Sequence, residues 1–189
     1  MTVIELKPVR ERILDAAAEH YYAEGIRAVS ADKLIAAAHV SKATFYRHFP
    51  SKNDLVAAYL ELRSEQEKEA VLAQREELSD DPAAVLRWYA DAVGQASCAP
   101  GFRGCPFINA AAELPAEDHP GRAVISAHRA WLTAQISELL GALGSDDPLA
   151  QAEQLMMLRD GAMISGYLGN APAEVSSALL AGGRTIIGR

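Results

Sequence analysis

Residues 30–52, SADKLIAAAHVSKATFYRHFPSK, constrain the fold of this chain more than any other stretch. Phe45 and Phe49 stand four residues apart, so they would lie on one face of a helix. The segment before them carries apolar residues at near-helical spacing: Leu34, Ile35, Ala38 and Val40. The stretch therefore predicts two helices that are joined by a tight turn and bury these residues together.

Start signals support this interpretation. Ser30 can cap the first helix and Ser41 the second, because a serine hydroxyl accepts a hydrogen bond from a backbone N–H of the first turn. Ser51, with Asp54 three residues later, resembles a capping box and predicts that a third helix begins there.

The outward face of the second helix has a distinctive composition. If Phe45 points inward, a turn of about 100° per residue places Ala43 and Arg47 on the opposite side, with Thr44 and Tyr46 beside them. The exposed face is therefore small or polar, and basic. Such a face is typical of a helix that reads DNA, although an exposed polar face without a partner is the alternative.

Composition predicts an all-helical fold of one large domain or two small ones. The chain has 189 residues, half of them apolar, which is enough to bury a core. Alanine, leucine and glutamate dominate, and short alternating runs of Val, Ile and Thr between turn signals are missing.

The net charge of −7 would disfavour a nucleic-acid partner if it were spread evenly. It is not, because residues 1–63 carry a net +1 and the remainder a net −8. Residues 27–52 hold five Lys and Arg against one acidic residue. A local basic patch on an acidic protein suits contact of one face with phosphates.

Several classes of protein are disfavoured. No apolar run reaches the roughly 18 residues that cross a bilayer, and the N-terminus lacks a signal peptide, so we expect a soluble, cytoplasmic protein with no membrane partner. Cys98 and Cys105 have no CxxC spacing or clustered histidines, which indicates thiols and neither a metal site nor a cofactor. The motifs GxSxG, GxxxxGK[ST] and HExxH are absent, so we do not expect an enzyme.

The rest of the chain also reads as helices. A first helix is expected from residue 9 to about 24, with Gly25 as its C-cap. Later helices are expected at about 51–77, 83–97, from Pro106 onward, and at 121–143, 147–168 and 172–187.

The N-terminal third closely resembles the DNA-binding domain of the TetR family of repressors. The matching runs are RERILDAAAEHYYAEG, a helix that begins at a serine, and AHVSKATFYRHFPSKNDL. His39 stands where the family usually has glycine, in a position expected to need a left-handed backbone. His20 replaces a usual leucine and is expected to be partly buried and hydrogen-bonded. The resemblance implies a helix-turn-helix domain at residues 1–50 and a ligand-binding and dimerisation domain at 51–189.

The resemblance also implies DNA contacts on the matching run. Lys42 and Ala43 would meet bases, and Lys52 would hold a backbone phosphate. Thr44, Tyr46 and His48 would reach phosphates or base edges. The full set of expected DNA-binding residues is Ser30, Ser41, Lys42, Ala43, Thr44, Tyr46, Arg47, His48 and Lys52.

A second resemblance lies in the loop CAPGFRGCPFINAAAEL. One branch of TetR-type regulators places a Gly-Cys-Pro-Phe-x-Asn segment at the wall of its ligand cavity. The candidate ligand-binding residues are Tyr59, Trp88, Cys105, Phe107, Asn109, His128, Trp131, Met156 and Arg159. Alternatives stay open. Cys105 is either a packing thiol or a redox sensor, a tryptophan at helical spacing is more often a core residue than a ligand contact, and Arg159 could lie at an interface.

The sequence therefore predicts a homodimeric regulator that pairs through residues of about 147–187 and binds a palindromic operator in double-stranded DNA. We expect a repressor that a small apolar or amphipathic effector releases. One alternative is a regulator that senses oxidants or electrophiles through Cys105. Another is a helical scaffold whose N-terminal unit contacts protein.

Overall fold

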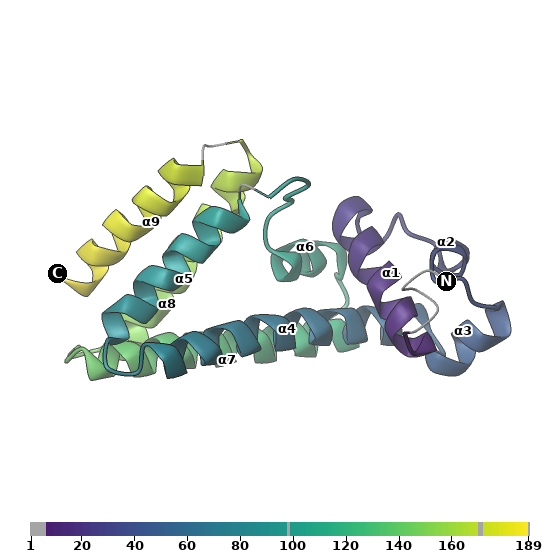
Figure 1. Ribbon diagram of the computed structural model, residues 1–189, viewed down its shortest axis with the longest axis horizontal. Coiled ribbons are helices and arrows are strands. Elements are labelled where there is room, and N and C mark those ends of the chain that lie inside the picture. Colours follow the sequence, from purple (N-terminus) through teal and green to yellow (C-terminus); the bar gives the residue numbers. More distant parts are fainter. Residues whose placement is uncertain (1–6, 98, 170–171, 189) are drawn as a thin grey trace. The chain divides into compact units, whose positions relative to one another are not determined.

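A computed structural model describes residues 7–97, 99–169 and 172–188 of the chain. Within them the secondary structure consists of nine helices and no strand, which confirms the predicted all-helical class (Figure 1). The helices are α1 (Val9–Glu24), α2 (Ala31–Ala37), α3 (Lys42–His48), α4 (Lys52–Glu77), α5 (Pro82–Ala96), α6 (Pro106–Glu113), α7 (Pro120–Ala142), α8 (Pro148–Tyr167) and α9 (Pro172–Ile187). Cys98 lies outside the described residues. No helix in the described ranges is both long and apolar enough to cross a membrane.

The chain divides into two compact units. The first unit comprises residues up to Glu65 together with Pro106–Ser126, and the second comprises Gln66–Cys105 and Ala127–Arg189. Helices α4 and α7 each supply residues to both units. This division reflects which parts of the chain are compact and does not test function. The expected boundary between the DNA-binding and ligand-binding domains, at residues 50 and 51, stays a prediction.

Local side-chain caps begin α2, α3 and α4, as predicted. The Ser30 hydroxyl accepts a hydrogen bond from the Lys33 N–H at 3.2 Å, and the Ser41 hydroxyl accepts one from the Thr44 N–H at 3.1 Å. At α4 the Ser51 hydroxyl accepts from the Asp54 N–H at 3.1 Å while the Asp54 carboxylate accepts from the Ser51 N–H at 3.0 Å. This is a reciprocal capping box.

The turn between α2 and α3 has the expected left-handed residue. His39 has a φ of 53°, the one positive φ of a non-glycine residue in the described ranges. The Val40 N–H donates to the Ile35 carbonyl at 3.2 Å, which closes the turn. A side chain in this region costs energy that glycine avoids. His39 therefore adopts the left-handed conformation that the turn needs, at some cost in folding free energy.

The core of the first unit forms around the two phenylalanines. Phe45 and Phe49 are 1% and 3% exposed, which confirms that both point inward. They are buried with residues of α1, α2 and α4, including Ile13, Ala17, Tyr21, Leu34, Leu55 and Leu60. Truncation of a buried phenylalanine to alanine typically costs about 3–5 kcal/mol, so this pair fixes α3 in place.

Helix α6 belongs to the first unit and holds the loop that follows α1. The Glu113 carboxylate accepts hydrogen bonds from the backbone N–H groups of Ile26, at 3.0 Å, and Arg27, at 2.8 Å. Gly25 comes just before them with a φ of 91°, and a Cβ there would lie 3.1 Å from a carboxylate oxygen of Glu113. Glycine at position 25 therefore suits both the positive φ of the loop and the close approach of the Glu113 carboxylate.

In the second unit α5, α8 and α9 pack side by side (Figure 1). One cluster of buried residues joins these helices: Ala90, Val93, Ala162, Val175 and Leu179. A second cluster joins α7 to α8: Leu132, Ile136, Leu140, Ala152 and Met156. Gly94 allows α9 to approach α5, because a Cβ there would lie 2.6 Å from Cβ of Ser176.

Candidate functional site

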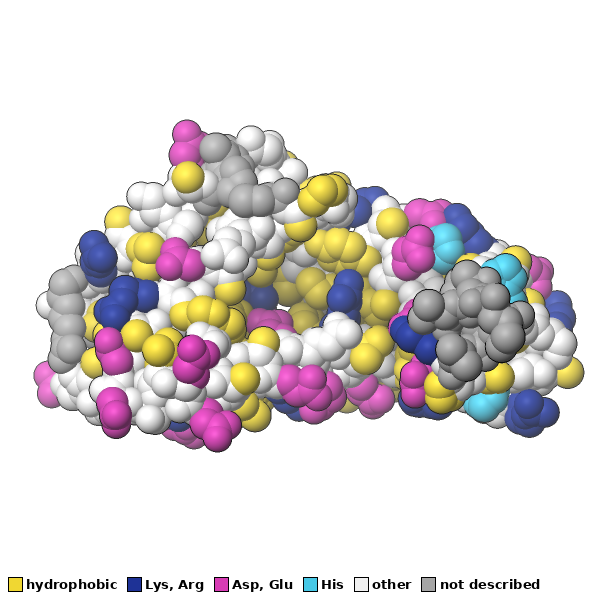
Figure 2. Space-filling model, viewed as in Figure 1, with side chains coloured by type: hydrophobic (Ala, Val, Ile, Leu, Met, Phe, Trp, Pro, Cys, Tyr) yellow, Lys and Arg dark blue, Asp and Glu magenta, His cyan; other side chains and the backbone are white. Residues whose placement is uncertain are grey.

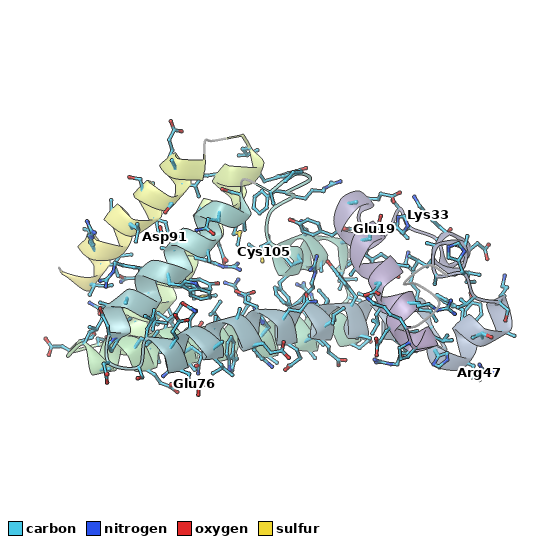
Figure 3. The ribbon with its side chains drawn as sticks, viewed as in Figure 1. Glu19, Lys33, Arg47, Glu76, Asp91 and Cys105 are labelled. Carbon is cyan, nitrogen blue, oxygen red and sulfur yellow. The ribbon has the colours of Figure 1, made fainter. Side chains whose placement is uncertain are left out.

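Helix α3 presents the face that the sequence predicted. Lys42, Ala43, Tyr46 and Arg47 are exposed, whereas Phe45 is buried. Thr44 and His48 are half-buried, and the Ser41 hydroxyl donates to the Thr44 hydroxyl at 2.9 Å. Figure 3 shows Arg47 extending outward from α3, and Figure 2 shows Lys, Arg and His side chains on this part of the surface.

The basic residues of the predicted patch fall into two groups. The Arg27 guanidinium and the Lys33 ammonium have partners inside the first unit, Glu113 and Glu24. Lys42 is 68% exposed and lies 3.5 Å from Asp32, which is 80% exposed, so this ion pair contributes little free energy. Arg47 forms no ion pair within the described residues.

Lys52 also has an internal partner. Its ammonium donates to the Val29 carbonyl at 2.7 Å and lies 6.0 Å from the centre of the Tyr21 ring. Burial lowers the pKa of Lys52, while the charge of Glu113 acts in the opposite direction. The lysine that was predicted to hold a phosphate therefore also ties α4 to the loop before α2.

The second unit contains a cavity of about 380 Å³ between α5, α7, α8 and α9. Its walls are mostly aliphatic: Ala83, Leu86, Ala90, Ile136, Leu143, Leu155, Leu179, Leu180, Gly183 and Ile187. The other lining residues are Arg87, Tyr89, Arg159 and Arg184. A volume of this size is within the usual range of small-molecule sites.

A buried polar network borders one part of the cavity. Arg159 is 4% exposed, and its Nε donates to the Tyr89 hydroxyl at 3.3 Å. The Tyr89 hydroxyl in turn donates to the Glu67 carboxylate at 2.6 Å. Arg159 Nη1 lies 3.2 Å from Cys105 Sγ and 3.2 Å from Asp160 Oδ1. Figure 3 shows Cys105 in the loop before α6.

The charged side chains of this network lie beside groups of opposite charge. Arg129 pairs with Asp160 at 2.7 Å, and Glu67 lies 3.6 Å from Arg159 and 3.3 Å from Nε2 of His128. Burial by itself would raise the pKa of Glu67, but the contacts with His128, Arg159 and Tyr89 bring it below its ordinary value. Burial likewise disfavours the charged form of Arg159, yet its neighbours hold its pKa above the ordinary value. Both groups are therefore ionised at neutral pH.

The structure separates the nine predicted ligand residues. Arg159 lines the large cavity, and Cys105 and His128 belong to the network behind it. Trp88 lines a hollow of only about 10 Å³, as do Tyr59 and Asn109 in the first unit. Phe107 and Met156 are buried in the cores, and Trp131 packs near His128 and Lys68. Their roles in ligand binding stay predictions.

The other thirteen lining residues were not predicted as site residues, among them Arg87, Tyr89 and Arg184, and neither was Glu67 of the network. Arg184 had a signal in the sequence, because it is the only cation in the largely apolar helix α9. Glu67 had none, since it is one of many charged residues along α4.

The fold and its first unit match known proteins. The family described as "Bacterial regulatory proteins, tetR family" matches residues 13–59. The crystal structure of SCO4454, a TetR-family transcriptional regulator from Streptomyces coelicolor, is 40% identical with a TM-score of 0.88, covering 95% of this chain and 94% of that one.

Two curated relatives add to this. The transcriptional regulator AcuR of Cereibacter sphaeroides is 28% identical over 187 residues, which is 95% of this chain and 85% of AcuR. YvkB of Bacillus subtilis, an HTH-type transcriptional regulator, is 39% identical over 59 residues, 31% of each chain. The helix-turn-helix of α2 and α3, the all-helical second unit and the full-length similarity to SCO4454 together show that this chain belongs to the TetR family of transcriptional regulators.

Proposed function

We propose that this protein is a repressor that binds a palindromic operator as a homodimer and releases it when a small effector occupies the cavity of the second unit. The observation that carries the proposal is α3, a recognition helix held by two buried phenylalanines with Lys42, Tyr46 and Arg47 exposed. The N-terminal part of such a helix reads base edges in the major groove.

The homodimer would form through α8 and α9. Met157, Ile164 and Leu168 are 66%, 48% and 76% exposed, and they follow one another at helical spacing on or directly after α8. Gly161 lies in the same stripe, with nothing within 4 Å of the position of a Cβ. An exposed apolar stripe with a small residue at its centre favours close helix packing with a second copy. A two-fold dimer would place two α3 helices about 34–36 Å apart on an inverted repeat.

Release requires that the effector bind the DNA-incompetent state more tightly. A preference of about 100-fold supplies a coupling of about 2.7 kcal/mol. The cavity of about 380 Å³ offers the volume for such a ligand, and its aliphatic walls favour an apolar part.

Selection of bound genomic fragments by the purified full-length protein, followed by titration of the enriched sequence, tests the proposal. We expect an inverted repeat, and we expect Arg47→Ala to relax the sequence preference while the fold is kept. Glu19→Ala, on an exposed position of α1, is the matched control and should leave the preference unchanged. Fragments enriched without any shared sequence would contradict operator recognition and favour the scaffold alternative.

A second candidate mode of release is chemical modification of Cys105. Its Sγ lies 3.2 Å from a guanidinium nitrogen of Arg159, and reactive cysteines generally lie beside a cation. The thiol is only 2% exposed, which limits access. Peroxide would release the operator from the parent protein but not from Cys105→Ser if this mode operates, and equal release from both would exclude it.

A further inference from the structure

Among the residues that the structure describes, the charged ones that line the cavity all have the same sign. They are Arg87, Arg159 and Arg184, and no carboxylate of the described ranges is in the lining. The carboxylates of Glu67 and Asp160 contact Arg159 but do not line the cavity. A cationic ligand would therefore meet like charge in this cavity and no partner.

The three arginines differ in what they can still bind. Arg159 is buried, and each of its three guanidinium nitrogens already faces Tyr89, Cys105, Asp160 or Glu67. Arg87 is exposed and pairs with Asp81 at 3.1 Å, a weak surface contact. Arg184 is also exposed and forms no ion pair within the part of the chain that the structure describes. Two guanidinium groups at the exposed rim of the cavity are thus available to an anion.

The interior of the cavity offers little to a polar group. Apart from the guanidinium groups, the Tyr89 hydroxyl is the only polar side-chain group among the described lining residues, and its proton is donated to Glu67 at 2.6 Å. The remaining walls are aliphatic. Burial of a polar group without a hydrogen-bond partner is unfavourable, so the interior favours hydrocarbon.

We propose that the effector is an amphipathic anion whose hydrocarbon part fills the aliphatic cavity and whose carboxylate is held at the rim by Arg184 and Arg87. The planar guanidinium group binds a carboxylate through two parallel hydrogen bonds, which gives preference over a neutral hydroxyl. This inference rests on the proposed function, because it names the chemical class of ligand for the same cavity.

Calorimetric titration of the full-length protein with decanoate, decanol and decylamine tests the inference, because the three probes share one chain and differ in head group. We expect decanoate to bind about tenfold more tightly than decanol, the gain from a charge-assisted contact at an exposed site. Decylamine should bind more weakly than either. Equal binding of decanoate and decanol, stronger binding of decylamine, or no binding of any of the three would overturn the proposal.

Arginine variants locate the contact. Arg184→Gln and Arg87→Gln should each weaken decanoate about threefold to tenfold and leave decanol unchanged, so that decanol binding also reports an intact cavity. Arg122→Gln removes one positive charge from the first unit, outside the cavity, and should change neither affinity. If the protein in which both Arg87 and Arg184 are replaced still binds decanoate more tightly than decanol, these two arginines do not bind the carboxylate.

Operator binding is measured separately and without any probe. Failure of operator recognition would therefore reject the proposed function, whereas loss of the decanoate preference alone would reject only the ligand class.

Discussion

Arg27 donates two hydrogen bonds to Glu113. The Arg27 backbone N–H donates to the Glu113 carboxylate at 2.8 Å, and Arg27 Nε donates to the Glu113 main-chain carbonyl at 3.0 Å. The same carboxylate accepts from the Ile26 N–H. One side chain of α6 thus satisfies two successive amides of the loop after α1, which are otherwise without a helical partner.

Glu113→Ala should lower the thermal midpoint of unfolding. The variant removes the acceptor of two amides, of which the Ile26 N–H is partly buried, at a cost of about 2 kcal/mol, which corresponds to about 5 °C for a chain of this size. Glu117→Ala, an exposed acidic residue shortly after α6, is the control and should change the midpoint little. Equal midpoints for the two variants, measured by circular dichroism, would show that the Glu113 contacts add nothing to stability.

Lys42→Ala and Lys52→Ala should separate DNA contact from stability. Lys42 is 68% exposed, so its loss should weaken DNA binding and leave the unfolding midpoint unchanged. Lys52 donates to the Val29 carbonyl, so its loss should also destabilise the protein by about 1–3 kcal/mol. Fluorescence titration of operator DNA over a range of salt should show a slope reduced by about one for each lysine that contacts a phosphate. An unchanged slope for Lys52→Ala would exclude its predicted phosphate contact.

Met157→Glu should dissociate the proposed homodimer. Its side chain is 66% exposed and begins the apolar stripe on α8, and a buried carboxylate at a two-fold interface would face its own copy. We expect a monomer by light scattering and a large loss of operator affinity. Glu153→Gln, one turn earlier on an exposed position, should leave the dimer intact. A Met157→Glu protein that stays dimeric would exclude this face of α8 from the interface.

Glu67→Gln should reveal a pH-dependent part of the stability. The pKa of Glu67 is lower in the folded protein than the ordinary value of 4.5, so the unfolded state takes up the proton first as the pH falls. The carboxylate therefore stabilises the fold above about pH 4.5, and this contribution is lost as the pH falls through the folded pKa. Removal of a partner from this buried network should cost about 2 kcal/mol at pH 7.

Urea unfolding at several pH values measures the effect. The difference between the parent protein and Glu67→Gln should narrow from pH 5 to pH 3. Glu76→Gln, at an exposed position of the same helix, is the control and should show no such difference (Figure 3). A constant difference across this range would contradict the assigned role of the carboxylate.

Gly183→Leu should block the cavity. A Cβ at Gly183, which lines the cavity on α9, would meet only Leu155 at 3.6 Å, so a longer side chain can extend into the free volume. We expect at least a tenfold loss of decanoate binding with operator binding retained. Gly141→Leu is the matched control, because nothing lies within 4 Å of a Cβ at that position of α7. Retained decanoate binding in Gly183→Leu would exclude this cavity as the effector site.

The sequence predicted the helices well because their signals are local. Ser30, Ser41 and the pair Ser51 and Asp54 specify where helices begin through contacts within three residues. His39 could be assigned a left-handed backbone from its place in the turn. The structure bears out all of these predictions, since no distant residue is needed to make them.

The cavity was much less predictable. Trp88 and Trp131 resemble ligand contacts by chemistry, yet the large cavity is lined by Leu179, Gly183 and Ile187 of α9. The spacing of apolar residues along a helix is the same whether they line a void or fill a core. The difference depends on how the four helices pack, which this spacing does not reveal. Arg159 was among the candidates because it lies inside a largely apolar helix, whereas Glu67 was one of many charged residues along α4.

All residues expected to contact DNA belong to the first unit, and all residues that line the cavity belong to the second. Substitutions in the lining that change ligand binding therefore leave the residues that are expected to contact the operator unaltered. We expect mutagenesis of the fourteen lining positions to change the effector and to keep the proposed operator contacts. Under the proposed function, effector specificity and operator specificity can therefore change independently.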